Sequence, residues 1–149
     1  MQQVEVRRSF AHPAQKVWDL TGDFGGLKNW LPGVTDCQVA GSGARDQGGN
    51  ATRAVHIMDG SVTRESLESF DDQAMSYRYG ILEAKGFDSN SSYFGTFTVV
   101  PQGDAGCEIV WRAEYTVPAE LPPEKVQKLK DKVQAMYGFF LLHLETVLK

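Results

Sequence analysis

The sequence predicts a single α+β domain over residues 1–149, in which a curved antiparallel sheet of seven strands packs on a long C-terminal helix. The first observation is that apolar and polar residues alternate at 2–10 and again through 34–117, which is the period of a half-buried strand. The second is that the spacing changes after Pro122 and Pro123, where apolar residues recur every three or four positions, as on one face of a helix.

Two short helices are predicted between the first strand and the rest of the sheet. The strand at 2–10 is followed by Pro13, which can occupy the first turn of a helix that continues to about Leu20. A second short helix is predicted at 24–30, loosened by the two glycines within it.

Six further strands are predicted in the middle of the chain. They cover residues 34–40, 50–58, 61–70, 75–83, 90–100 and 107–117. The pair Asp59-Gly60 is the strongest hairpin signal, whereas the glycine-rich stretch from Gly41 to Gly49 indicates a longer loop. Because parallel neighbours need a crossover of about a dozen residues or more, these short connections predict antiparallel pairing.

The C-terminal helix is predicted from Glu124 to Lys149. Its expected inward face consists of Leu129, Val133, Met136, Phe140, Leu144 and Val147. Between Met136 and Leu144 the helix is apolar nearly all round, so its back also needs cover. We expect that cover from the short helices, and a weak homodimer is the alternative. The covering side chains would be Val17, Trp18, Leu20 and Phe24.

Composition and charge exclude several classes of function. The net charge of −4 argues against a nucleic-acid partner, because phosphate binding favours a basic surface. The sequence lacks the long apolar run of about 18 residues that membrane insertion needs. Residues 1–6 lack the basic and then apolar form of a signal peptide, so we expect a cytoplasmic protein.

Neither a metal nor a cofactor is expected. Cys37 and Cys107 lack CxxC spacing and a nearby histidine, which indicates free thiols. The histidines have no HxH or HxxxH spacing. The stretch 22–26 is rich in glycine but follows a helix and lacks the lysine of a phosphate loop.

Aromatic residues with polar tips gather on the predicted inner faces of the later strands. Tyr77 and Tyr79 share one face of 75–83, and Trp111 shares one face of 107–117 with Tyr115, whereas the pattern at 90–100 fits either face. Such residues are typical of a small-molecule pocket, and the alternative is a filled core. The predicted ligand-binding residues are Trp30, Leu67, Tyr77, Tyr79, Tyr93, Trp111, Tyr115, Met136 and Phe140.

Glu65 and His56 are the candidate catalytic residues. Glu65 shares a strand face with the apolar Leu67, and a buried carboxylate is costly unless it is neutral or paired. A two-residue loop at Asp59-Gly60 would place His56 on the same face as Glu65, as acid/base proton transfer requires, and Arg53 on the opposite face. The alternative is that both residues are ordinary solvated strand residues.

Several motifs resemble a known family. They are His12-Pro13-Ala14-Gln15-Lys16-Val17-Trp18, Gly22-Asp23-Phe24-Gly25-Gly26-Leu27, Trp30-Leu31-Pro32-Gly33, Asp59-Gly60, Arg64-Glu65-Ser66-Leu67-Glu68, Asp71-Asp72 with Tyr77-Arg78-Tyr79, and Trp111. With the element order, they resemble the helix-grip proteins of the SRPBCC superfamily, which includes birch-pollen-allergen and START-like proteins, and in particular its bacterial polyketide cyclase/dehydrase-like branch. Where that branch often has a proline-bearing segment before the sixth strand, this chain has 84–88.

The resemblance implies a cavity between sheet and helix that holds a small hydrophobic or aromatic molecule. An enzyme of this kind would combine shape-directed positioning with proton transfer by Glu65 or His56. The alternatives are a carrier or sensor of a hydrophobic ligand, including lipid, and a protein-interaction module. A cavity below about 300 Å³ would favour the interaction module.

Overall fold

The computed structural model describes residues 1–41, 51–88 and 90–149. The predicted loop from Gly41 to Gly49 lies outside the described residues except for Gly41. The first residue of the strand predicted at 50–58 also lies outside them. The elements, in order, are β1 (Gln2–Phe10), α1 (Ala14–Thr21), the 3-10 turn η1 (Leu27–Asn29), β2 (Val34–Ala40), β3 (Thr52–Ile57), β4 (Val62–Asp71), β5 (Ser76–Glu83), β6 (Tyr93–Gln102), β7 (Gly106–Tyr115) and α2 (Pro123–Val147).

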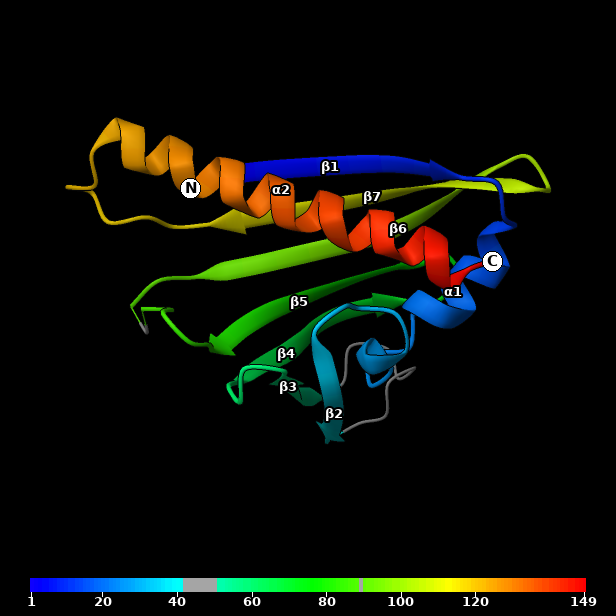
Figure 1. Cartoon of the computed structure of the whole chain (residues 1–149), viewed down its shortest axis with the longest axis horizontal. Coiled ribbons are helices and arrows are strands. Elements are labelled where there is room, and N and C mark those ends of the chain that lie inside the picture. Colours follow the sequence, from blue (N-terminus) through cyan, green and yellow to red (C-terminus); the bar gives the residue numbers. More distant parts are fainter. Residues whose placement is uncertain (42–50, 89) are drawn as a thin grey trace.

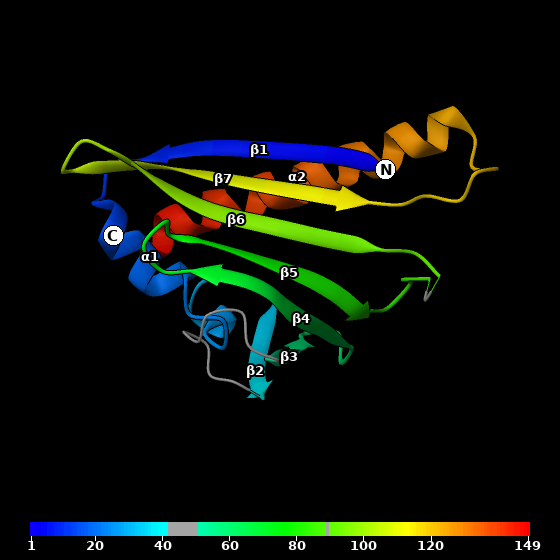
Figure 2. The same ribbon diagram turned by 180° about the vertical axis from the view of Figure 1, so that it is seen from behind.

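The seven described strands form one antiparallel sheet in the order β1-β7-β6-β5-β4-β3-β2. Figure 1 shows α2 lying across one face of this curved sheet, with its C-terminal end close to α1. Seen from behind in Figure 2, the strands lie in front and α2 behind them, so no helix of the described chain covers this outer face. The predicted α+β helix-grip fold is confirmed.

The second predicted short helix is much shorter than expected. Where a helix was predicted at 24–30, the chain forms only the three-residue turn η1. The adjacent Gly25 and Gly26 make a longer helix costly, because glycine loses the most backbone freedom on ordering. Phe24 and Leu27 are nevertheless buried, so this segment contributes side chains to the core.

The inward face of α2 is rotated from the predicted one. The buried residues of this region are Val133, Tyr137, Leu141, Leu144 and Leu148, whereas Leu129, Met136 and Val147 are exposed. The predicted series, from Leu129 to Val147, and the buried series both have spacings of three and four residues, so periodicity alone did not separate them. Tyr137 therefore occupies the inward position that we predicted for Met136.

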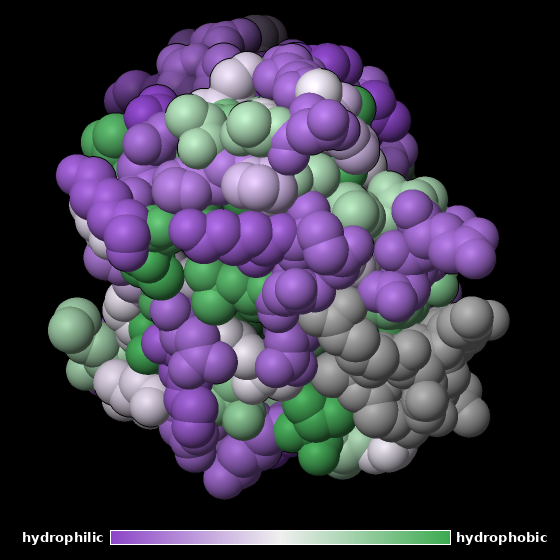
Figure 3. Space-filling model, turned by 90° about the vertical axis from the view of Figure 1, so that its right-hand side faces the viewer, coloured by the Kyte–Doolittle hydropathy of each residue, from purple (hydrophilic) through white to green (hydrophobic). Residues whose placement is uncertain are grey.

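The prediction that side chains of the short helices cover the back of α2 is wrong. Phe139 and Leu142 are 58% and 54% exposed, while Val17 and Trp18 of α1 are buried in the core. The helix α1 contacts β6 and β7 and meets the end of α2 through a hydrogen bond from Lys16 Nζ to the backbone oxygen of Leu148. At the end of the molecule drawn in Figure 3, hydrophobic side chains lie in small groups among hydrophilic ones.

The described residues contain no helix that is long and apolar enough to cross a membrane. Nor do they contain a group of three His, Cys, Asp or Glu side chains placed to hold a metal ion. Cys37 and Cys107 are free thiols, as predicted, and burial raises the pKa of each.

Candidate functional site

The β3–β4 hairpin determines which side chains of these two strands face α2. Its loop is three residues long, from Met58 to Gly60, and the backbone N–H of Ile57 donates to the oxygen of Ser61. Gly60 has φ +89°, a conformation that favours glycine. Asp59 Oδ1 accepts hydrogen bonds from the backbone and hydroxyl of Ser61, which lowers the pKa of Asp59 to about 2.

The loop has one residue more than predicted, and this shifts the pairing of β3 with β4 by one position. Arg53 lies directly opposite Glu65, so both side chains are on the inner face. The prediction that Arg53 and Glu65 occupy opposite faces is therefore wrong, because a register shift of one residue moves every side chain to the other face.

The same shift separates His56 from Glu65. His56 pairs with Val62 and Asp36, and it alternates with Arg53 and Ile57, which line the inner face. The prediction that His56 and Glu65 share one wall is wrong. His56 is thus placed away from the cavity described below.

Arg53 and Glu65 form a buried ion pair. Arg53 is 3% and Glu65 is 9% exposed. Arg53 Nε and Nη2 lie 2.8 and 2.7 Å from Glu65 Oε1, and Nη1 donates to the backbone oxygen of Phe24 at 2.9 Å. Burial alone would lower the pKa of the guanidinium, but the Glu65 carboxylate outweighs burial and raises it.

Only one oxygen of Glu65 is used by this pair. Both close contacts from Arg53 are to Oε1, and Oε2 makes no hydrogen bond with the residues that the structure describes. The Arg53 guanidinium also lies 4.2 Å from the ring centre of Phe24 and 5.3 Å from that of Tyr79. The carboxylate is therefore held in one place, with a second oxygen that no described residue uses.

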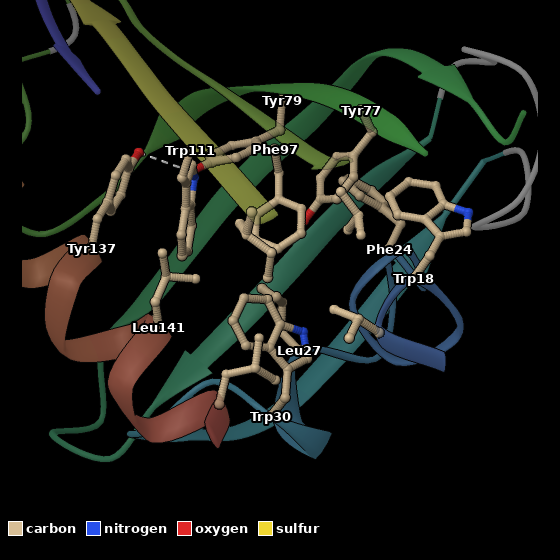
Figure 4. Close-up of a cluster of buried hydrophobic side chains, with 14 of the residues drawn as sticks. Trp18, Phe24, Leu27, Trp30, Tyr77, Tyr79, Phe97, Trp111, Tyr137 and Leu141 are labelled. Carbon is tan, nitrogen blue, oxygen red and sulfur yellow. Dashed lines mark hydrogen bonds between the residues drawn. The ribbon is translucent and has the colours of Figure 1, made fainter. Parts of the chain in front are cut away.

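A chain of hydrogen-bonded aromatic side chains lies beside this ion pair. Trp111 Nε1 donates to the Tyr79 hydroxyl at 3.1 Å, the Tyr79 and Tyr137 hydroxyls lie 3.0 Å apart, and the Tyr93 hydroxyl bonds to that of Tyr137. Figure 4 shows Tyr137 reaching from α2 toward Tyr79 beside Trp111. The Trp111 and Tyr137 rings stack with centroids 4.1 Å apart.

Burial raises the pKa of all three tyrosine phenols, so each is a neutral hydroxyl at ordinary pH. The position of Tyr79 depends on Gly95, its partner on β6, because a Cβ at residue 95 would clash with the Tyr79 ring. Glycine at position 95 therefore leaves the space that the Tyr79 ring occupies.

These groups surround a cavity of about 230 Å³ between the sheet and α2. Its polar side is formed by Arg53, Glu65 and Thr63, and most of the remaining wall is apolar or aromatic. The full lining is Leu27, Leu31, Arg53, Val55, Ile57, Thr63, Glu65, Tyr77, Tyr79, Ile81, Ala84, Tyr93, Trp111, Met136, Tyr137 and Phe140. The arrangement can hold a ring between apolar walls and offers hydrogen-bonding groups at two places.

The structure brings together most, but not all, of the predicted ligand-binding residues. Those that line the cavity are Tyr77, Tyr79, Tyr93, Trp111, Met136 and Phe140. Trp30 is instead a core residue, 5.6 Å from the ring of Phe97, and Leu67 is also buried outside the lining. Tyr115 lines a neighbouring groove.

Sequence reasoning missed Arg53 and Tyr137 as parts of the cavity. A three-residue loop with glycine in the left-handed conformation would have placed Arg53 correctly, and Asp59-Gly60 is compatible with it. Tyr137 belongs to the buried series from Val133 to Leu148. The sequence did not reveal this series, because apolar residues occur on nearly every face of this part of the helix.

Solved structures with the same fold include XoxI from Bacillus cereus, with 24% identity, a TM-score of 0.80, and coverage of 99% of this chain and 96% of that one. The di-domain ARO/CYC protein BexL of the BE-7585A biosynthetic pathway shares 14% identity with a TM-score of 0.80, over 99% of this chain and 46% of that one. Norcoclaurine synthase from Thalictrum flavum shares 18% identity with a TM-score of 0.69, over 99% of this chain and 83% of that one. At these identities the likeness shows the fold alone.

No curated protein sequence matches the chain significantly. A family model, described as polyketide cyclase / dehydrase and lipid transport, matches residues 1–149. This match covers the whole chain and agrees with the observed sheet and helix. The chain therefore belongs to the polyketide cyclase/dehydrase and lipid transport family.

Proposed function

We propose that this protein binds a small aromatic molecule with one hydrogen-donating group, such as a phenol, in the cavity between its sheet and α2. The observation that carries the proposal is the combination of apolar aromatic walls with the unused Oε2 of Glu65. A ligand hydroxyl that donates to Oε2 would satisfy this acceptor, while the ring packs against Tyr79 and Trp111.

The volume restricts the size of the ligand. At about 230 Å³ the cavity is below the range of about 300–1,000 Å³ that is usual for drug-sized ligands. An apolar cavity of about 150 Å³ nevertheless accommodates benzene. So small a volume, below about 300 Å³, favours the protein-interaction module, which therefore stays an alternative. Among ligands, the size favours a molecule of one or two rings over a large polycyclic substrate or a long lipid. The norcoclaurine synthase structure, a complex with dopamine and hydroxybenzaldehyde, supports one-ring phenols as probes.

The binding of para-cresol, measured by titration calorimetry, tests the proposal. Wild type should bind para-cresol more tightly than toluene by roughly 3- to 10-fold, the worth of one hydrogen bond. Met136→Trp should weaken binding because Met136 lines the cavity, whereas Phe139→Trp adds the same side chain at a position outside the lining and serves as control. If wild type binds neither compound, the proposal fails.

A second candidate function is acid/base catalysis by Glu65. A carboxylate fixed by Arg53 at one oxygen leaves the other to accept a proton from a bound substrate, as cyclisation or dehydration requires. Exchange of the methyl protons of para-hydroxyacetophenone in heavy water, followed by NMR, measures such proton abstraction. Glu65→Gln should reduce the exchange rate by about 100-fold or more and leave affinity within a few-fold. A non-catalytic carrier would instead show no catalysed exchange in either protein.

A further inference from the structure

A second pocket adjoins the inner cavity at Tyr93. This outer groove has a volume of about 320 Å³ and lies between α2, the chain after β7 and the segment before β6. Its apolar lining includes Phe87, Tyr115, Val117, Leu129 and Val133. Tyr93 lines both the groove and the inner cavity.

Tyr93 is fixed between the two spaces by contacts on two sides. Its ring stacks on Tyr115 with centroids 5.8 Å apart and an interplanar angle of 17°. Its hydroxyl bonds to that of Tyr137 on α2. One side chain, held by a stacked ring and a hydrogen bond, therefore stands between the two spaces.

We infer that Tyr93 is a specificity-determining residue that limits the ligand to a compact ring, and that the outer groove accepts an apolar substituent on that ring only when Tyr93 is displaced or removed. This inference rests on the proposed function. A long alkyl substituent would have to displace Tyr93 and break its bond to Tyr137, which weakens binding by roughly 2- to 10-fold. Without Tyr93 the substituent would continue from the cavity into the groove.

A series of para-alkylphenols of increasing chain length tests the inference. In wild type, affinity should stop rising after the first few carbons. In Tyr93→Ala, each added methylene should increase affinity by about fourfold until the groove is filled. Tyr93→Phe retains the ring but loses the bond to Tyr137, so it should still limit chain length, with a penalty on long chains that is smaller by roughly 2- to 10-fold. If wild type and Tyr93→Ala have the same dependence on chain length, the inference is wrong.

A ligand-independent measurement separates this inference from the proposed function. In crystals pressurised with xenon, Tyr93→Ala should show density that is continuous from the cavity into the groove, whereas wild type should show two separate spaces. Tyr93→Leu is the second variant if the alanine variant does not fold. If neighbouring side chains fill the space and the two spaces stay separate, the inference is wrong. A wild type that binds no phenol would contradict the proposed function, and the xenon experiment would still decide the role of Tyr93.

Discussion

Removal of the Glu65 carboxylate should destabilise the protein strongly, because it leaves the charge of Arg53 buried and unpaired. Arg53 is 3% exposed, so solvent cannot replace the two contacts of 2.7 and 2.8 Å that Glu65 provides. Breaking a buried pair in this way typically costs about 3–5 kcal/mol. For a chain of 149 residues this corresponds to a lower melting temperature by about 6–20 °C.

A double-mutant cycle separates the unpaired charge from the loss of packing. Arg53→Met with Glu65→Leu removes both charges and leaves mainly the Phe24 carbonyl without its partner, which costs about 1–3 kcal/mol. The double variant should therefore be more stable than Glu65→Leu, the single change that leaves Arg53 charged and unpaired. Urea unfolding followed by circular dichroism measures both free energies.

The exposed pair between Glu5 and Arg112 provides the control, and Glu5→Ala should change the unfolding midpoint little. The reasoning fails if Glu65→Ala costs no more than Glu5→Ala. It also fails if the double variant costs the sum of its two single changes, because the residues would then be uncoupled.

Three further predictions concern packing, pH and association. Gly95→Ala should displace the Tyr79 ring and destabilise the fold by about 1–3 kcal/mol, which chemical unfolding measures. Because burial raises the pKa of Tyr79 and Tyr137, the contribution of these two phenols to stability should stay constant below about pH 10. It should then fall, by up to about 1.4 kcal/mol per pH unit for each phenol, as unfolding releases their protons; unfolding midpoints against pH, with Tyr79→Phe as comparison, test this slope. The exposed Phe139 and Leu142 predict weak self-association at high concentration, which sedimentation should detect and Phe139→Lys should reduce; a wild type that remains monomeric would contradict it.

The sequence predicted the order of elements and the inward faces of β5 and β7 correctly, because alternation along these strands is clear. Tyr77, Tyr79 and Trp111 are buried as expected. On β6, where the pattern fitted either face, the structure places Tyr93 and Phe97 inward and Phe94 outward, over the Arg78 guanidinium.

The polar part of the cavity depended on a detail that composition does not reveal. Asp59-Gly60 predicts a hairpin but not its loop length, and the difference between two and three residues decides whether Arg53 or His56 faces Glu65. A similar ambiguity affected α2. Several adjacent apolar faces were available there, and packing against the sheet selected the one that contains Tyr137.

The indole N–H resonance of Trp111, followed by NMR during addition of para-cresol, tests most directly whether the cavity binds a small phenol. Trp111 lines the cavity and donates to Tyr79, whereas Trp18 bonds to Asp72 and does not line it. We expect a saturable shift of the Trp111 signal that is larger than any shift of Trp18 and weaker in Met136→Trp. If the Trp111 signal does not move, or moves linearly without saturation together with that of Trp18, the cavity does not bind this class of molecule.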